Sequence, residues 1–593
     1  MSAEQPEPIA VAPVPAAPPK PWFLTPTSPG FARMTAAVTA VVAHLALLVQ
    51  AGRGLGKDWG YFDSLSLVVR SNVFGYGSFP LHNPWACGGL DLLTNPQSRV
   101  FSPLMLADLA LPPQLANLFG LMLYAFIGFI GALKLLEHLG VGRVAALIGA
   151  ALWINASWFG LHFAEGHIAY GPMQLLPLVF YAVMRIGSRR HLLLLAAVFA
   201  WFLLDGAIYA LIFATLAIIL MLLLGLVPRR EWKALVAGPR WPLVVIPLAA
   251  LLVALPRIYP LVANVGARAP KLETYEMPWA LLRAALFDPL QTYGPFEHKP
   301  RIPWRFHEYA CYVSLLGLAL VLVTAVVRRG FFKASWRFVV ATAFWLWVGA
   351  GWFPAVNPWK LFQQIPFANN AHIQSRVFIV MLVFFVVLVA KALDAWRSKK
   401  LVFAVLGGLL VVESAVVRIY PTTQLERDKH DAPGYDLIAS TTIARTVGRT
   451  LGGPEFYLDS PDTGSAKCYE PSFTPTRIAV TDKQPPLPEA SPLDTTRGSK
   501  VTLVAYTPGE IDLDYRLKRA TPIVLNTNAL WGWQVAEGSA TLSGRGDELL
   551  QVTPADLSGH LHLTYAPPWV PWLVAAWLAG LGALVITWRR TRA

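Results

Sequence analysis

Two aspartates stand where a carboxylate could act as a base, in the connection 52–114 that follows the first long apolar run. They are Asp58 and Asp63, and both fall close to the end of that run. A carboxylate at a membrane edge is partly desolvated, which suits it to take a proton from a hydroxyl group. A solvated aspartate flanking a helix is the simpler interpretation, and Asp63 would also suit the N-cap of the apolar run behind it.

Amide side chains follow in the same connection. Asn83, Asn95 and Gln97 stand in turn-rich sequence between two apolar runs, 65–74 and 103–111. Both runs are too short to span a bilayer, and they predict helices that lie along its surface. A connection this long and this patterned is more than a linker, and we expect these amides to contact a substrate.

Cationic side chains near the ends of apolar runs suit a phosphate group. Arg376 opens one such run, and its planar guanidinium matches the geometry of phosphate oxygens. Arg70 and His372 are weaker candidates for the same role. An arginine that snorkels to the lipid head groups is the alternative interpretation.

The spacing His162-x-x-Glu165-x-His167 raises the question of a metal. On a helix the first two side chains share a face, whereas His167 joins them only if the turn bends back. We favour the alternative, in which Glu165 and His167 line an aqueous cavity and bind sugar hydroxyls. No cofactor is therefore predicted, and a divalent cation is kept as a second hypothesis.

These residues need a scaffold, and the composition indicates one embedded in a membrane. The 593 residues are 55% hydrophobic and only 14% charged, whereas soluble proteins carry roughly 25% charged residues. The net charge of +14 does not indicate nucleic acid, because the basic residues punctuate apolar runs instead of forming one basic face. Runs approaching the ~20 residues needed to cross a bilayer predict about twelve transmembrane helices, at 34–51, 115–137, 143–161, 168–186, 191–205, 207–227, 241–262, 309–327, 337–353, 375–396, 401–418 and 568–588.

Basic residues predict the orientation of these helices. Five alternate connections carry clusters of Lys and Arg, whereas the short turns 160–167 and 205–207 between the other helices carry none. The positive-inside rule places the basic connections and both termini in the cytoplasm. The long connections 52–114, 263–308, 354–374 and 419–567 then lie outside, and we expect the chemistry on that face of the membrane.

The chain divides into four parts by composition. Residues 1–33 predict a disordered, proline-rich cytoplasmic tail. Residues 34–418 form the transmembrane domain, and 568–593 the last transmembrane helix with a basic cytoplasmic tail. The part between them, 419–567, is polar and predicts an extracytoplasmic β-sandwich, with strands at 500–506, 511–517, 522–525, 532–535, 540–542, 549–552 and 560–565.

The first outer connection resembles that of YfhO-type membrane proteins, which belong to the GT-C superfamily of polyprenyl-phosphate-dependent glycosyltransferases. An aspartate near the end of the first helix precedes the matching residues, which are Pro80, Leu81, Asn83, Pro84, Gly88, Gly89, Asn95, Pro96, Gln97, Ser98 and Pro103. Weaker matches follow at Glu165-Gly166-His167, at Ser375-Arg376-Val377-Phe378 and at Leu530-Trp531-Gly532-Trp533. Only the motif in the first connection is specific.

The resemblance implies a GT-C-like fold, a catalytic aspartate in the first outer connection and a polyprenyl-phosphate sugar donor. It predicts an inverting transfer of one sugar to a cell-envelope glycan, lipid or protein. A transporter or flippase of lipid-linked glycans is the second hypothesis, against which the nearly charge-free helix interiors argue. A non-catalytic membrane anchor that binds glycans is the third.

Overall fold

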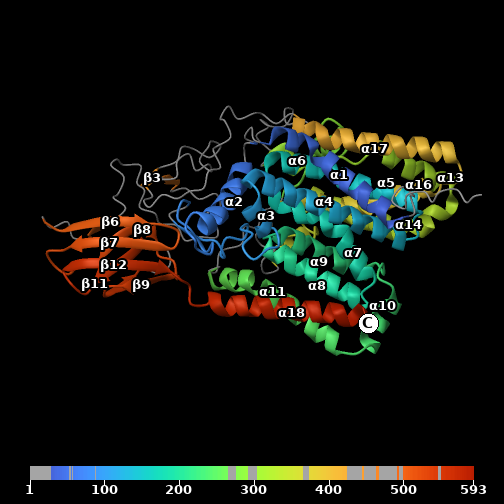
Figure 1. Ribbon diagram of the computed structural model, residues 1–593. Helices are drawn as coiled ribbons and strands as arrows, with labels where there is room; N and C mark the ends of the chain where they lie inside the picture. Colours follow the sequence, from blue (N-terminus) through green and yellow to red (C-terminus); the bar gives the residue numbers. More distant parts are fainter. Residues whose placement is uncertain are drawn as a thin grey trace, which may run out of the picture.

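The computed structural model describes residues 28–51, 55, 58–86, 89–264, 275–291, 304–364, 373–423, 444–446, 463–465, 490–492, 498–544 and 549–592. Figure 1 shows a body of packed helices from whose end a β module projects, next to α2 and α3. The last helix, α18, returns along the helical body from the β module to the C-terminus (Figure 1).

The helical body is built from α-helices of very different lengths and three 3-10 segments. In chain order these are α1 (Pro29–Gln50), α2 (Trp59–Phe74), α3 (Met105–Ala110), α4 (Pro113–His138), α5 (Arg143–Ile154), α6 (Ser157–Glu165), η2 (Ile168–Leu175), α7 (Leu176–Met184), α8 (Arg189–Leu204), α9 (Ile208–Leu223), α10 (Arg229–Ala237), α11 (Trp241–Asn264), α12 (Trp279–Phe287), η3 (Phe306–Glu308), α13 (Leu315–Val327), α14 (Arg329–Ala350), α15 (Trp359–Phe362), η5 (Gln374–Val377), α16 (Phe378–Asp394), α17 (Lys400–Thr423) and α18 (Val570–Arg592).

Within the described residues, seven helical stretches are long and apolar enough to cross a membrane, and the chain is a polytopic helical membrane protein. They are Pro29–Gln50, Pro113–His138, Arg143–Glu165, Trp241–Ala263, Gln374–Asp394, Lys400–Pro421 and Val570–Thr591. Helices occupy all twelve predicted ranges, but the count of twelve spans is not confirmed. The remaining helices are short, as α9 is, or open on basic residues, as α14 does.

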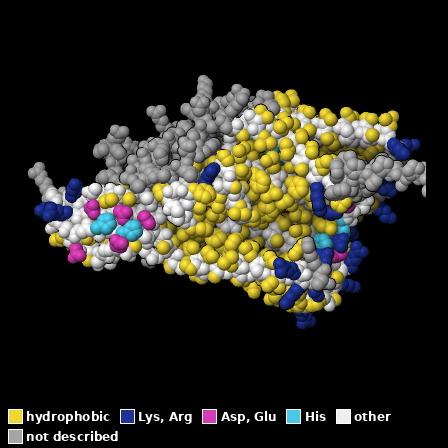
Figure 2. Space-filling view, in the orientation of Figure 1, with side chains coloured by type: hydrophobic (Ala, Val, Ile, Leu, Met, Phe, Trp, Pro, Cys, Tyr) yellow, Lys and Arg dark blue, Asp and Glu magenta, His cyan; other side chains and the backbone are white. Residues whose placement is uncertain are grey.

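The surface of the helical body fits this assignment. Figure 2 shows hydrophobic side chains covering its length, with most Lys and Arg gathered at the end away from the β module. That end carries α10 and the C-terminus in Figure 1. The predicted basic connections thus meet at one end, as the positive-inside rule requires of a cytoplasmic face, although the side of the membrane itself stays a prediction.

All seven predicted strands are present, each within about three residues of the expected bounds, and an eighth precedes them. One sheet has the order β10-β11-β8-β5 and the other the order β6-β7-β12-β9. The strands are β5 (Ala490–Pro492), β6 (Lys500–Tyr506), β7 (Glu510–Arg516), β8 (Ile523–Asn528), β9 (Trp533–Glu537), β10 (Ala540–Ser543), β11 (Leu549–Pro554) and β12 (Ser558–Tyr565). Two shorter strands, β3 (Ala444–Thr446) and β4 (Thr463–Ser465), pair in parallel.

The two sheets share one core. Leu513 of β7 lies opposite Leu561 of β12 in the first sheet, and both pack in one cluster with Ile523 and Val552 of the second sheet. Alternate residues of β7 are buried, while Glu510, Asp512 and Asp514 face outward, because successive strand side chains point to opposite faces. The module is therefore a sandwich of two four-stranded sheets.

The specific motif of the first outer connection forms a small hairpin that docks on this sandwich. Strands β1 (His82–Asn83) and β2 (Leu90–Asp91) pair antiparallel. The hydroxyl of Tyr565 donates a hydrogen bond to Oδ2 of Asp91 at 3.0 Å, and Nδ2 of Asn528 donates to the carbonyl of Gly89 at 2.8 Å. The left-handed φ of 101° at Gly89 and the nearness of Thr527 leave no room for a side chain there.

A buried arginine of α11 holds the second half of the same connection. Nη1 of Arg257 donates to the carbonyls of Leu92, Leu93 and Asn95 at 3.2, 3.0 and 2.5 Å, and Nη2 donates to the carbonyl of Ser98. The expectation of nearly charge-free helix interiors is therefore wrong for α11. The guanidinium is retained there because its N–H groups satisfy carbonyls that would otherwise be buried without partners.

Candidate functional site

The start of α2 is fastened to the end of α6. The backbone N–H of Asp58 donates to the carbonyl of Glu165 at 3.1 Å, and the indole N–H of Trp59 donates to the carbonyl of Phe163 at 2.8 Å. Gly166 ends α6 with a φ of 92°, and a Cβ at this position would clash with the backbone of Trp59. A glycine is required here because only it combines a left-handed conformation with so close an approach.

This junction brings a carboxylate against a pair of histidines. Oδ2 of Asp58 lies 3.2 Å from Nε2 of His167. The other ring nitrogen of His167, Nδ1, lies 2.8 Å from Nδ1 of His162. The turn after α6 therefore does bend back, so that His162 and His167 meet although they do not share a helix face.

Two 3-10 segments complete the cluster from the far side. In η3, Nδ1 of His307 lies 3.6 Å from Oε1 of Glu165, and its Nε2 lies 3.5 Å from Oε1 of Glu308. In η5, Arg376 donates from Nε and Nη2 to the two carboxylate oxygens of Glu308, at 2.8 and 2.6 Å. The hydroxyl of Ser375 donates to the backbone carbonyl of Glu308 at 2.6 Å, which fixes η3 against η5.

Two aromatic rings flank Arg376. Its guanidinium carbon lies 5.1 Å from the ring centre of Tyr170 and 5.0 Å from that of Tyr209. Both distances allow a cation–π interaction. The fork on Glu308 and the two rings together hold the positive charge at one fixed place.

The cluster has a more exposed side, its mouth, and a buried side, its floor. The side chains of Asp58 and His167 are 23% and 15% exposed, whereas those of Glu165, Glu308 and Arg376 are 5%, 7% and 8% exposed. A molecule that approaches from solvent therefore meets Asp58 and His167 first.

Electrostatic coupling within the cluster shifts two pKa values. Burial would lower the pKa of His167, but the hydrogen bond with Asp58 and the charge of Glu308 outweigh it and raise the pKa. Burial would likewise raise the pKa of Glu308, yet the guanidinium of Arg376 and the contact with His307 hold it well below its usual value. Both shifts follow from opposite charges that share a buried space.

Four of the residues proposed from the sequence thus come together: Asp58, Glu165, His167 and Arg376. The second aspartate does not. Asp63 is only 1% exposed and accepts a hydrogen bond from Nδ2 of Asn117 at 2.6 Å.

Asp63 belongs to a separate buried network. Nη2 of Arg99 donates to Asn117 and to Asp108, both at 2.5 Å, and to Ser66 at 2.9 Å. This network ties α2, α3 and α4 together. The place of Asp63 in it indicates a packing role.

The other predicted contacts lie elsewhere. Arg70 follows Asp58 by twelve residues within α2, which corresponds to about 18 Å along a helix. Oδ1 of Asn83 accepts from the backbone N–H of Trp85 at 3.1 Å, so this amide stabilises a turn beside the β module. His372 lies outside the described residues.

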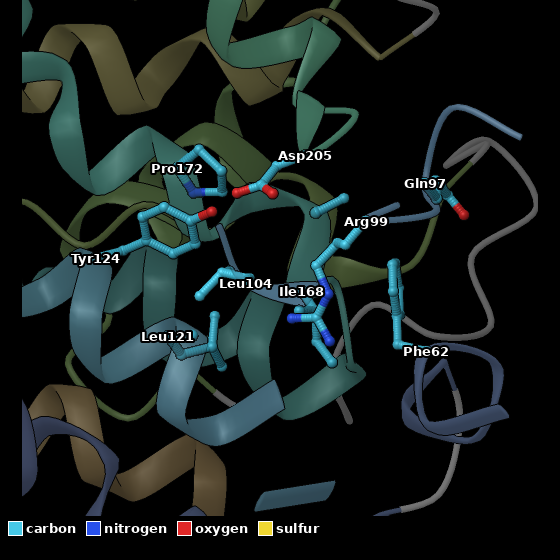
Figure 3. Close-up of a pocket in the computed structure, with 11 residues that line it drawn as sticks. Phe62, Gln97, Arg99, Leu104, Leu121, Tyr124, Ile168, Pro172 and Asp205 are labelled. Carbon is cyan, nitrogen blue, oxygen red and sulfur yellow. The ribbon is translucent and has the colours of Figure 1, made fainter. Parts of the chain in front are cut away.

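Asn95 also shapes the backbone. Its Nδ2 donates to the hydroxyl of Tyr61 at 3.0 Å, and its Oδ1 accepts from the backbone N–H of Gln97 at 2.9 Å. Its role in the described conformation is to form the turn that Arg257 clamps. Gln97 lies at the rim of a neighbouring hollow, and its amide points away from that hollow in Figure 3.

This hollow adjoins the cluster and has an empty volume of about 310 Å³. Phe62, one helical turn after Asp58, and Ile168, directly after His167, line it on one side. Asp205, in the turn between α8 and α9, lines the other side, where its carboxylate and the Tyr124 hydroxyl point toward one another (Figure 3). Burial raises the pKa of Asp205 to about 7, and Ser102 and Arg99 offset only part of this effect.

Sequence reasoning missed half of the cluster. His307 and Glu308 are adjacent acid–base residues directly before a predicted helix, at 309, and that adjacency is the only local signal for them. Tyr170 and Tyr209 carry no signal beyond being aromatic.

The ligand atoms of His167, His307 and Glu308 all lie within 4.8 Å of one another, so these three could hold a metal ion.

Comparisons with known proteins give little further guidance. No family model matches the chain, and no curated protein matches it either. Among solved structures, it is similar to the cryo-EM structure of the arabinofuranosyltransferase AftD from Mycobacteria, with 16% sequence identity and a TM-score of 0.41. The similarity covers 68% of this chain and 28% of the AftD chain. A likeness this remote carries no argument about function, and the YfhO-type resemblance gains no support from it.

Proposed function

We propose that this chain is an inverting glycosyltransferase of the GT-C type, which moves a sugar from a polyprenyl-phosphate donor to a cell-envelope glycan, lipid or protein. The observation that carries the proposal is the place of the Asp58 carboxylate, at the mouth of a buried polar cluster. The cluster belongs to α2 and α6, away from the basic end of the helical body (Figures 1 and 2). A lipid-linked donor reacts at a membrane surface, which suits this position.

Asp58 is the base in this proposal. The acceptor oxygen attacks the anomeric carbon while the bond from that carbon to the phosphate oxygen breaks. The hydroxyl proton passes to Asp58, and the bonding electron pair leaves with the lipid phosphate. Phosphate is a good leaving group, so a general acid is not needed. His167, 3.2 Å away, orients the carboxylate.

Arg376 is the expected partner of the phosphate. Cationic groups stabilise the charge that develops on a leaving phosphate. In the described conformation two of its donor groups are taken by Glu308. Arg376 therefore acts as a fixed positive charge below the mouth of the site, and a bidentate grip on phosphate would require the pair with Glu308 to open.

The sequence motif supports the same architecture by a different route. Asn83, Gly89 and Asn95 shape the first outer connection, which Arg257 and the β module hold in place. We propose that the motif of YfhO-type proteins preserves this scaffold and that it does not touch the sugar. Orientation by the positive-inside rule puts the site on the outer face of a bacterial plasma membrane.

A flippase of lipid-linked glycans is the second candidate, and one observation favours it. Arg418 of α17 is fully buried, with Nη2 3.2 Å from Nε2 of His44 in α1. Charged side chains inside membrane helices mark transport pathways in many proteins. The pair lies beside Phe163 of α6.

The test uses the full-length protein reconstituted in vesicles with a radiolabelled polyprenyl-phosphate sugar. The first arm adds an envelope extract and measures radiolabel in the acceptor fraction. The second arm measures movement of the labelled lipid between leaflets without acceptor. Label in the acceptor supports the transferase. Leaflet exchange without any transfer contradicts it and supports the flippase.

A further inference from the structure

We propose that His167, His307 and Glu308 form a binding site for one divalent transition-metal ion, of the Zn²⁺ class, beneath Asp58. Each side chain offers one ligand atom, and these atoms lie within 4.8 Å of one another. Two imidazoles and one carboxylate are a ligand set that leaves a coordination position open for a substrate oxygen. The site rests on geometry alone, whereas its use in catalysis rests on the proposed function.

One pair of ligand atoms already has a suitable separation. Nε2 of His307 lies 3.5 Å from Oε1 of Glu308. Two ligands at tetrahedral angles and ~2.05 Å from a zinc ion are about 3.3 Å apart. Both ring nitrogens of His167 now have contacts, with Asp58 and with His162, and binding of the cation would replace one of them.

Glu308 can bind the ion and keep its arginine. Arg376 donates one hydrogen bond to each of its carboxylate oxygens. A carboxylate has about four lone-pair positions, so each oxygen retains capacity for a second partner. Arg376 then acts as an outer partner that orients the metal-binding carboxylate, an arrangement common around protein metal sites.

Glu165 is the outer partner of His307, as Arg376 is of Glu308. Its Oε1 lies 3.6 Å from Nδ1 of His307, the ring nitrogen opposite the one that faces Glu308. A carboxylate on the second nitrogen of a metal-binding imidazole fixes the tautomer that leaves the first nitrogen its lone pair. The cluster therefore supplies both ligands and the groups that orient them.

The charges of the cluster point the same way. Its contacting side chains include three carboxylates, from Asp58, Glu165 and Glu308, against the single guanidinium of Arg376. With neutral imidazoles, as ligands require, the three carboxylates and the guanidinium sum to a net charge of −2. One divalent cation would balance that charge and would make the space favourable for an anionic phosphate.

The ligand types select the metal class. Imidazole nitrogens suit zinc, copper, iron and nickel ions, whereas Mg²⁺, Ca²⁺ and Mn²⁺ prefer oxygen ligands. A bound zinc ion would act as a Lewis acid toward a phosphate oxygen. We therefore expect Zn²⁺ to bind far more tightly than Mn²⁺ or Mg²⁺.

The test measures metal content directly. Full-length protein without a polyhistidine tag is stripped with a chelator, loaded with Zn²⁺, Mn²⁺ or Mg²⁺, separated from free ions and analysed by mass spectrometry of the elements. We expect one Zn²⁺ per chain. His307→Gln should abolish retention, and Glu165→Gln should weaken affinity about 10–100-fold, as loss of an outer partner does. His138→Gln, at the end of α4, is the matched control and should retain the ion.

Thermal melting of each variant checks that it is folded. Retention that His307→Gln leaves unchanged, or wild-type protein that retains no ion, overturns the site. A sugar-transfer assay keeps the two proposals apart. Transfer that persists after the bound ion is removed shows that the ion has no part in catalysis, and it leaves the transferase standing. If the protein binds an ion that His307→Gln removes but never transfers sugar, the metal site stands and the proposed transferase is wrong.

Discussion

Oδ2 of Asp58 lies 3.2 Å from Nε2 of His167, although the two residues flank different helices. Their contact exists because α2 begins where α6 ends and because Gly166 lets the two backbones touch. Asp58 is thereby held at the mouth of the cluster, while Glu308 and Arg376 lie on its floor.

Gly166→Ala should destabilise the protein by at least about 2 kcal/mol, because the new Cβ would meet the backbone of Trp59 at a left-handed φ of 92°. Denaturant or thermal unfolding in detergent measures the change. Gly408→Ala in α17 is the matched control, since its Cβ would meet nothing within 4 Å, and it should be neutral or slightly stabilising. Equal losses for the two variants would contradict the close approach.

Glu308→Gln should cost about 3–5 kcal/mol, because it leaves the buried guanidinium of Arg376 without its opposite charge. Arg376→Met in the same chain should restore much of that loss. Unfolding of the two single variants and the double variant gives the coupling free energy. Strictly additive losses would show that the fork between these residues is not formed.

Arg257→Gln should loosen the first outer connection, because several backbone carbonyls between 92 and 98 lose their donor together. Each unsatisfied buried group costs about 1–3 kcal/mol, so we expect a loss at the upper end of point-mutant effects. Hydrogen exchange of residues 89–110 localises the change. Exchange that rises only within α11 would argue against the clamp.

Stability should depend on pH through Asp205. Its folded pKa, about 7, lies above the unfolded value of 3.8. The folded state therefore retains a proton that the unfolded state has lost. Its stabilising contribution is complete below about pH 4 and is lost as the pH rises to about 7, a total of about 4 kcal/mol. Asp205→Asn should remove this slope, and unfolding measured from pH 4 to 7 compares the two proteins. Parallel pH profiles would contradict the raised pKa.

Much of the framework follows from periodicity. Alternation along 510–516 and 558–565 predicts strands because Leu513 and Leu561 pack inward between outward-facing polar residues. Apolar runs such as 113–138 predict helices by length alone. These are local signals. The fold agrees with them because burial of one face of a strand, or of a whole apolar run, dominates the energetics.

The site was only partly predictable. Asp58 and the group 165–167 stand out as polar residues at the ends of apolar runs, but nothing local shows that they meet. Asn95 illustrates the converse, since a conspicuous amide turns out to bond its own turn. His307 and Arg257 find their partners through tertiary approach, and such contacts leave no periodic trace in one sequence.

The most direct test of the account is the rate of sugar transfer from a polyprenyl-phosphate donor by Asp58→Asn, with Asp63→Asn and the exposed Asp556→Asn as controls. Loss of a general base lowers rates about 10²–10⁴-fold, and melting curves confirm that each variant is folded. We predict such a loss for Asp58→Asn, with transfer retained by folded Asp63→Asn and by Asp556→Asn. Wild-type rates with Asp58→Asn, or a loss confined to Asp63→Asn, would contradict it.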